Sequence, residues 1–324
     1  NSWRISPPKC NGWKWRRFNG TLHKADQFPP IPLMENPVSE KKLPPHTTIG
    51  IPVCNKPHCV EPLIQCIEAM RMPRQDMLLL VVDVSGNPKI NQRLSQWTKE
   101  QGKSGAWNNV LYVDQPQHEQ VTEYVGRTDI DRFMKKRWLV AETKNLVNNF
   151  RIGDLFFIEE DTLCPPGSYE KLRRILDEHP DVGVASGVNY SRSENSTLGN
   201  HTVWKFQSNM LFPFGEHIPG QTQTTATPIG EKPFGIELVG GCGNGCMLAR
   251  EDIMRGYRFV GNSTISGMSG SDVNFGWYVT QLRRKFYAVD WSIKTKHLDI
   301  DKKMNVLDVY TSPHYGNDYN WNAN

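Results

Sequence analysis

The chain reads Leu-Phe-Phe-Ile-Glu-Glu-Asp-Thr at residues 155–162, so four apolar residues end abruptly in three carboxylates. A Cys-Pro-Pro-Gly segment at 164–167 and a helical pattern follow. An apolar strand that delivers acids at its carboxyl end is typical of a ligand site in an α/β sheet. Three adjacent carboxylates repel one another unless a cation or protons neutralise them. The stretch therefore predicts a buried strand that leads into a metal-assisted site, with a solvated turn as the alternative.

The bulk properties indicate one large α/β domain with appendages. The chain has 324 residues, of which 38% are hydrophobic and 22% charged, as in a soluble globular enzyme and unlike a disordered chain. A net charge of +4 permits an anionic partner without demanding nucleic acid. No apolar run approaches the roughly 20 residues of a membrane helix. We therefore expect no membrane span.

Cysteine usage favours a reducing compartment. The chain has 7 cysteines at scattered positions, and Cys54, Cys66 and Cys164 lie in apolar contexts typical of small core residues. We therefore expect a cytoplasmic protein, or one in the host-cell cytoplasm if it is viral. Glycosylation sequons beginning at positions 19, 195, 200 and 262 favour the secretory lumen as the alternative.

Alternating strands and helices are expected from residue 47 onward. The run Met-Leu-Leu-Leu-Val-Val at 77–82 is typical of a parallel strand buried on both faces. This alternation predicts a doubly wound, mostly parallel α/β sheet. Strands are predicted at 47–54, 77–84, 109–113, 155–158, 182–186 and 286–294, and helices at 60–72, 136–150, 168–178 and 272–284.

Three segments depart from this alternation. Residues 1–47 are rich in proline with basic-aromatic clusters, and we expect an extended N-terminal arm. Residues 190–235 lose periodicity and read as a lid or acceptor-side insertion within a catalytic domain that spans 48–300. The polar stretch 301–324 reads as a C-terminal tail.

Short motifs follow the predicted strands. The chain has Ile-Pro-Val-Cys-Asn at 51–55, Val-Asp-Val-Ser-Gly at 82–86, Glu-Thr-Lys-Asn at 142–145, Gly-Gly-Cys-Gly-Asn-Gly at 240–245 and Gly-Ser-Asp-Val at 270–273. No Gly-x-Gly-x-x-Gly opens the first helix and no P-loop occurs, which argues against a dinucleotide or P-loop site.

Together these motifs resemble glycosyltransferases of the GT-A fold, in the style of family 2-like enzymes, over about residues 47–300. The resemblance implies a GT-A type, Rossmann-like sheet with the arm and the irregular insertion as additions. The acids at 159–161 are similar to the family's D-x-D motif, except that Glu159 replaces the first Asp. Ser271 stands where the family has Glu before its catalytic Asp.

The resemblance also implies roles for individual residues. Asp272 is expected to be the general base, or to orient the acceptor in a retaining enzyme, although it also suits a helix N-cap. Three further residues have structural roles as alternatives to ligand binding. Asp83 can be a turn residue at the end of a strand, Lys144 a solvated helix residue, and His297 a structural histidine. The implied donor-binding residues are Pro52, Asp83, Lys144, Glu160 and Gly241, and the implied ligands of Mn²⁺ or Mg²⁺ are Asp161, Glu159 and His297.

The expected function is metal-dependent transfer of a hexosyl or pentosyl group from a nucleotide sugar, foremost a UDP-sugar, to an acceptor hydroxyl. A glycan, lipid, protein or modified DNA base remains open as acceptor; aromatic and basic residues at 13–18 can stack on bases or sugars, or pack as part of the arm. One alternative is a nucleotidyltransferase that makes the sugar nucleotide, but residues 49–57 lack its basic Gly-rich signature. The other is a non-catalytic glycan- or nucleic-acid-binding module on the same scaffold.

Overall fold

The computed structural model describes residues 46–115, 130–189, 202–206, 226–228, 235–261, 271–300 and 306–308. The chain divides into two units, Asn1–Lys42 and Leu43–Asn324, and all described residues belong to the second. Except for residues 46 and 47, the expected N-terminal arm lies outside the described residues, as do most of the expected insertion and most of the tail.

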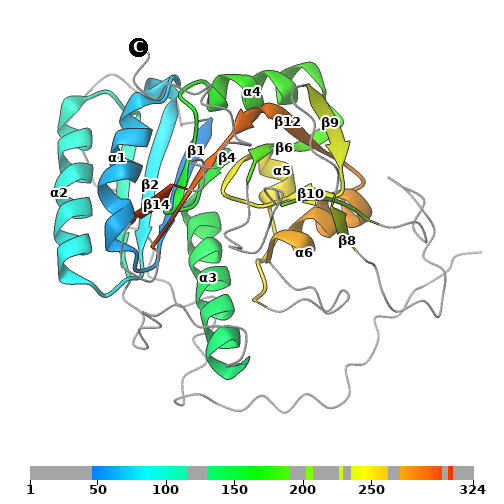
Figure 1. Ribbon diagram of the computed structural model, residues 1–324. Helices are drawn as coiled ribbons and strands as arrows, with labels where there is room; N and C mark the ends of the chain where they lie inside the picture. The colour runs from blue at the N-terminus through cyan, green and yellow to red at the C-terminus, as the bar shows by residue number, and fades with distance from the viewer. Residues whose placement is uncertain are drawn as a thin grey trace, which may run out of the picture. The chain divides into compact units, whose positions relative to one another are not determined.

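One mixed sheet of eight strands organises the described part of the chain (Figure 1). Six strands run in one direction, while β11 is antiparallel to β4 and β6, and β9 is antiparallel to β12. This mostly parallel α/β sheet confirms the GT-A type fold predicted from the sequence. In spatial order the strands are β3 (Asn109–Asp114), β2 (Met77–Asp83), β1 (Thr47–Val53), β4 (Asp154–Ile158), β11 (Cys246–Ala249), β6 (Val182–Val188), β12 (Phe286–Lys294) and β9 (Ile236–Val239).

Helices cover both faces of the sheet, as a doubly wound fold requires. Along β2 the side chains alternate: Leu79 and Val81 join one buried cluster, and Leu80 and Val82 join the other. This alternation explains why the strand is a continuous apolar run, because both of its faces are covered. The first cluster includes residues of α1 (Val60–Ala69), α2 (Pro88–Ser104) and α4 (Ser168–Glu178), and the second includes residues of α3 (Ile130–Phe150), α5 (Glu251–Met254) and α6 (Ser271–Trp277).

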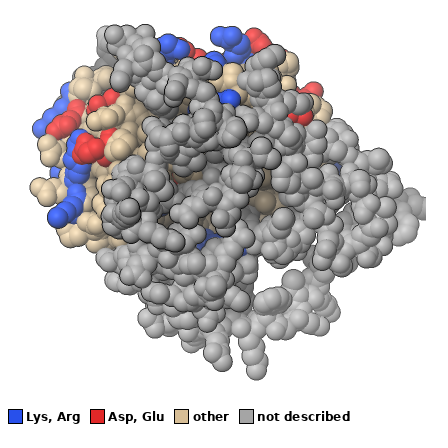
Figure 2. All heavy atoms as spheres, in the orientation of Figure 1, with Lys and Arg blue, Asp and Glu red and all other residues tan. Residues whose placement is uncertain are grey.

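Helix α2 is not among the elements predicted from the sequence. Its local signals are clear: the Asn87 side chain accepts a hydrogen bond from the Lys89 amide at 3.0 Å, Pro88 occupies the first turn, and Gly105 ends the helix with a φ of 69°. Figure 2 shows basic and acidic side chains interspersed over the flank formed by α1 and α2, where Arg93 pairs with Glu61. Because most residues of this helix are polar or charged, its few apolar residues form a weak periodic pattern in the sequence.

Three predicted helices differ in extent from the observed ones, and one of them, α3, begins at Ile130 instead of residue 136. Helix α1 ends at Ala69, not at residue 72, and Met70 is already extended. Pro73 follows closely, and a proline disfavours helical backbone at the residue before it. The predicted helix 272–284 is instead α6 followed by a π-helical turn, Tyr278–Leu282. Turns of this kind recur next to functional sites.

Two small sheets flank the main one. β5 (Thr162–Leu163), β13 (Lys296–Ile300) and β14 (Val306–Asp308) form the first, and β10 (Gly241–Cys242), β7 (Val203–Phe206) and β8 (Ala226–Pro228) form the second. β5 begins directly after the acidic run, and β13 follows β12. The pairing of β5 with β13 therefore brings the chain after residue 295 to the acidic run.

Membrane-spanning helices and cysteines are the two features that bear on the protein's cellular environment. Within them, no helix combines the length and apolarity needed to cross a membrane. Cys66 and Cys164 are buried core residues, as expected, whereas Cys54 is only partly buried. None of these three is in a disulfide bond in the described part of the chain.

Candidate active site at the carboxyl edge of the sheet

The acidic run lies in a turn at the end of β4. The Glu159 amide donates to the Gly245 carbonyl at 3.3 Å, and the Thr162 amide donates to the Glu159 carbonyl at 3.0 Å. The Cys54 amide, at the end of β1, donates to Oε2 of Glu160 at 2.9 Å. Because β1, β2 and β4 are parallel, their carboxyl ends meet at one edge of the sheet. The acids therefore lie where ligands bind in open α/β sheets.

Two lysines divide the acids between them. Nζ of Lys144 lies 2.7 Å from Oε1 of Glu159. Nζ of Lys56 forms an ion pair with Asp161 and lies 3.6 Å from Oε1 of Glu160. These ammonium groups relieve the repulsion that the sequence predicts among three adjacent carboxylates. Lys56 is a functional candidate that the sequence motifs did not identify.

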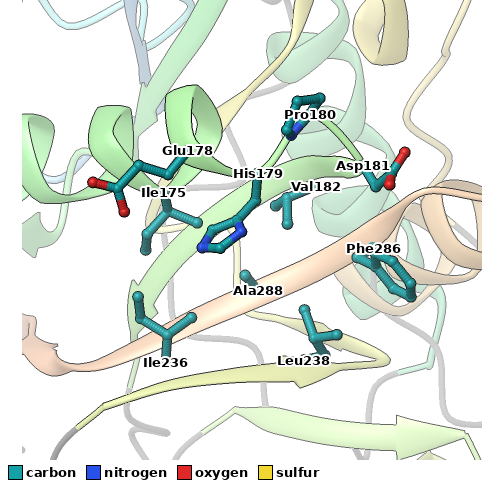
Figure 3. Close-up of a pocket in the computed structure, with 10 residues that line it drawn as sticks. All are labelled: Ile175, Glu178, His179, Pro180, Asp181, Val182, Ile236, Leu238, Phe286 and Ala288. Atoms are coloured by element: carbon teal, nitrogen blue, oxygen red, sulfur yellow. The ribbon is translucent and has the colours of Figure 1, made fainter.

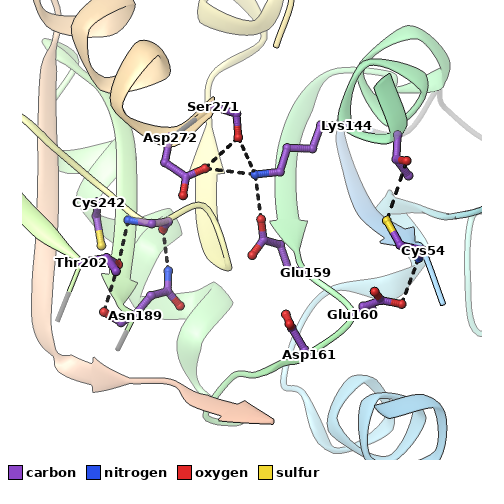
Figure 4. Close-up of polar contacts among 12 residues, drawn as sticks. Cys54, Lys144, Glu159, Glu160, Asp161, Asn189, Thr202, Cys242, Ser271 and Asp272 are labelled. Carbon is purple, nitrogen blue, oxygen red and sulfur yellow. Dashed lines mark hydrogen bonds and ion pairs between the residues drawn. The ribbon is translucent and has the colours of Figure 1, made fainter. Parts of the chain in front are cut away.

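Lys144 is a buried charge that joins the acidic turn to α6 (Figure 4). Its Nζ also lies 3.0 Å from Oδ1 of Asp272 and 3.1 Å from Oγ of Ser271. Burial opposes the charged form, but the carboxylates of Asp272 and Glu159 outweigh it and raise the pKa of Lys144 well above its usual value. Lys144 is therefore a buried cation held by two carboxylates and not a solvated helix residue.

Asp272 lies in the first turn of α6, and its side chain is 32% exposed. Its Oδ1 receives hydrogen bonds from Lys144 and, at 3.1 Å, from the Ser271 hydroxyl. In the described part of the chain its Oδ2 has no hydrogen-bond partner. One oxygen thus fixes the carboxylate while the other remains able to accept a proton, as a general base requires.

His297 reaches the acids through strand pairing. In the β5–β13 ladder His297 lies opposite Thr162, and the Leu298 amide donates to the Asp161 carbonyl at 2.7 Å. As a result, Nε2 of His297 lies 3.4 Å from Oδ2 of Asp161. The two side chains come from positions far apart in the sequence, and both are of the kind that a divalent cation accepts.

Asp83 is buried at the carboxyl end of β2. Its Oδ1 accepts from the Ser85 amide at 2.8 Å and its Oδ2 accepts from the Tyr112 hydroxyl at 2.8 Å. Burial, together with this bond to Asp83, raises the pKa of Tyr112 above its usual value. Pro52 pairs with Val82 in the neighbouring strand. Asp83 therefore fulfils the strand-end turn role, and Tyr112 is a partner that no motif revealed.

The glycines of 240–245 allow close packing around the site. A Cβ on Gly241 would lie 2.9 Å from the Trp204 ring. A Cβ on Gly245 would lie 2.5 Å from Oγ1 of Thr162 and 2.8 Å from Oδ1 of Asn189. Real Cβ atoms do not approach other atoms this closely, so the backbone here needs glycine. These close contacts lie within the protein, and donor binding by Gly241 stays a prediction.

Two cysteines near the site are protonated thiols. The low-dielectric surroundings of Cys54 and the nearby Glu160 carboxylate raise the pKa of this thiol to about 12, and burial raises the pKa of Cys242 to about 11. A nucleophile or metal ligand must be a thiolate. Neither residue therefore suits nucleophilic chemistry at neutral pH. The carboxylates are the candidate reactive groups of this region.

The ligand set implied by the sequence is only partly assembled. Asp161 and His297 are together, while Glu159, the third expected ligand, is held by Lys144. Within the described residues, no group of three His, Cys, Asp or Glu side chains is arranged to hold a metal ion. An oxygen and a nitrogen donor still fit Mn²⁺ or Mg²⁺, provided that a ligand supplies further oxygens.

A separate pocket of about 430 Å³ lies away from the acids (Figure 3). Val182 and Phe286, which begin β6 and β12, are among its lining residues, so it opens toward the edge of the sheet opposite to the acidic turn. The lining residues are mainly apolar: Ile175, Glu178, His179, Pro180, Asp181, Val182, Ile236, Leu238, Phe286 and Ala288.

No protein-family model and no curated protein matches the chain. Solved structures that resemble it include A197 from STIV, with 13% identity and a TM-score of 0.35 over 81% of this chain and 93% of that one. Mannosyltransferase PcManGT from Pyrobaculum calidifontis, in complex with GDP-Man and Mn²⁺, has 17% identity and a TM-score of 0.34 over 45% and 36%. S. aureus TarS 1-349 in complex with UDP-GlcNAc has 12% identity and a TM-score of 0.41 over 75% and 55%. The chain spans less than two thirds of the length of the last two structures. The GT-A type fold is assigned from the sheet topology described above.

Proposed function

We propose that the chain is a metal-assisted glycosyltransferase that moves a sugar from a nucleotide-sugar donor to an acceptor hydroxyl. The observation that carries this proposal is the ion-pair network in which Lys144 joins Glu159, after β4, to Asp272, at the start of α6. It gathers a candidate base and the acids of the D-x-D-like run at the ligand-binding edge of a GT-A type sheet.

In this proposal Asp272 is the general base. Oδ1 is fixed by Lys144 and Ser271, and Oδ2 takes the proton of the acceptor hydroxyl as that oxygen attacks the sugar. Inversion at the anomeric carbon follows if this displacement is direct. The buried Lys144 keeps the carboxylate oriented, which reduces the freedom lost on reaching the transition state.

The donor is expected along the carboxyl ends of β1 and β2. Asp83 uses one lone pair of each oxygen within the protein, and a carboxylate oxygen has a second one for a ribose or base donor. Pro52, Lys144, Glu160 and Gly241 remain the other proposed donor contacts. A UDP-sugar with a hexosyl or pentosyl group is the first donor to test, with glycan, lipid, protein and modified DNA as acceptor classes.

Asp161 and His297 would hold Mn²⁺ or Mg²⁺, because their donor atoms already face each other. When bound, the cation neutralises charge on the departing nucleoside diphosphate. Glu159 can join as a third ligand only if it leaves Lys144. The chain's own residues orient the acceptor, take its proton and balance the charge of the site.

Donor binding and donor cleavage test the proposal. The full chain is titrated with UDP-, GDP- and CDP-sugars by calorimetry, and release of the nucleoside diphosphate is followed with and without Mn²⁺. Asp272→Asn should retain donor binding and lower turnover about 100-fold or more. Asp177→Asn, on the exposed surface of α4, is the matched control and should behave as wild type. A folded wild-type chain that neither binds nor cleaves any sugar nucleotide would contradict the proposal, and binding without cleavage would favour a non-catalytic module.

A further inference from the structure

A lysine already supplies positive charge where the divalent cation is expected. Nζ of Lys56 forms an ion pair with Oδ2 of Asp161, and His297 faces the same oxygen from 3.4 Å. Lys56 also lies 3.6 Å from Oε1 of Glu160. The oxygen that best suits a metal ion is thus shared between an ammonium group and an imidazole.

The two acids are buried and need this charge. The side chains of Asp161 and Glu160 are 1% and 6% exposed, whereas that of Lys56 is 25% exposed. A buried carboxylate without a cation is strongly unfavourable. Lys56 therefore stabilises the acidic turn before any ligand arrives, and its flexible, partly exposed stem allows the ammonium to move toward solvent.

We propose that Lys56 is a built-in cation that competes with the divalent metal ion for Asp161. The metal ion binds only when the ammonium leaves Oδ2, because two cations at one oxygen repel each other strongly in a region of low dielectric. In the donor-free protein the ammonium of Lys56 thereby neutralises Asp161, and the metal binds weakly. This inference deepens the proposed function and rests on it for the role of the metal ion.

A direct test measures Mn²⁺ binding in the absence of any donor. The electron paramagnetic resonance signal of free Mn²⁺ is followed while the full chain, or a variant, is added. Lys56→Met should bind Mn²⁺ about tenfold more tightly than wild type, because the competing charge is gone. Lys56→Arg retains the charge and should keep the weak affinity. Lys89→Met, on the exposed face of α2, is the matched control and should equal wild type.

A double variant tests whether the gain in Mn²⁺ affinity arises at Asp161. In Lys56→Met combined with Asp161→Asn, the gain should disappear. A gain that survives Asp161→Asn would overturn the proposal, as would a folded Lys56→Met protein, verified by circular dichroism, whose Mn²⁺ affinity equals or falls below that of wild type.

If Lys56→Met does not fold, the proposal is tested with the wild-type protein. Amine acetylation is followed by mass spectrometry at each lysine, without and with saturating Mn²⁺. Mn²⁺ should accelerate labelling of Lys56 severalfold and leave Lys89 unchanged, since only Lys56 is displaced into solvent. An unchanged rate at Lys56 overturns the proposal. Because no donor is present, a protein that passes these tests and yet cleaves no sugar nucleotide would contradict the proposed function alone.

Discussion

Nζ of Lys144 lies 3.0 Å from Oδ1 of Asp272, so a buried charge on α3 holds the first turn of α6. The same atom lies 2.7 Å from Oε1 of Glu159, after β4. One side chain therefore joins three elements that meet only in the folded chain. It couples stability to function, because the groups that it neutralises are the proposed base and one proposed metal ligand.

Replacing Lys144 with Met should destabilise the fold. The variant fills a similar volume but leaves Glu159 and Asp272 without their shared cation, and removing one partner of a buried pair costs on the order of 3 kcal/mol. Urea denaturation measures the loss in the free energy of unfolding. Adding Asp272→Asn removes one of the unpaired charges, so the double variant should lose less than the sum of the single ones. A loss for Lys144→Met within the error of the measurement would contradict this account.

Asn145 is expected to be essential for the segment that packs beside Lys144. Its Oδ1 accepts from the Phe259 amide at 2.7 Å, and its Nδ2 donates to the Phe259 carbonyl at 3.0 Å. Asn145→Leu leaves two buried backbone groups unpaired, which should cost about 3 kcal/mol of unfolding free energy. The matched control is Asn149→Leu, because Asn149 is exposed on the same helix. Equal stabilities of the two variants in urea denaturation would refute the assignment.

Six of the eight strands of the main sheet were predictable because they carry strong local signals, whereas β9 and β11 were not predicted. The apolar run of β2 indicated burial on both faces, and β12 and α4 have the predicted bounds. Helix α2 was not predicted, because charged and polar residues dominate its sequence. Within the site, spacing in the sequence indicates that acids follow a strand but not which cation each one meets. The contacts of Lys56 with Asp161 and of Lys144 with Asp272 depend on tertiary packing, so the sequence could not reveal them.

The bond between Tyr112 and Asp83 should appear in the dependence of stability on alkaline pH. Burial and Asp83 raise the pKa of Tyr112 in the folded state above the value of about 10 expected in the unfolded chain. The protonated phenol therefore contributes stability that is fully present below pH 10 and is lost as the pH rises toward the folded-state pKa. The stability advantage of wild type over Tyr112→Phe should shrink from pH 8 to pH 11 in urea denaturation. A constant difference would mean that the phenol proton plays no part.

Gly245→Ala should disturb the acidic turn directly. Its new methyl group would lie 2.5 Å from Oγ1 of Thr162 and 2.8 Å from Oδ1 of Asn189. Neither atom can move freely, because Thr162 is buried and Asn189 Oδ1 accepts a hydrogen bond from Thr295 at 2.7 Å. Overpacking of this kind costs about 1–3 kcal/mol, and the Mn²⁺ affinity should change as well because the Gly245 carbonyl accepts from the Glu159 amide.

Gly102→Ala is the control with the opposite expected sign. Gly102 lies within α2, and the nearest atom to its added methyl group is Val110 Cβ at 3.9 Å. Alanine in a helix is more stable than glycine by about 0.5–1 kcal/mol, so this variant should gain stability. Combining Gly245→Ala with Thr162→Ala removes the closest clashing atom and should restore part of the loss. If Gly245→Ala instead matches wild type in both urea denaturation and Mn²⁺ binding, the tight contact between this glycine and the acidic turn is not what holds the acids.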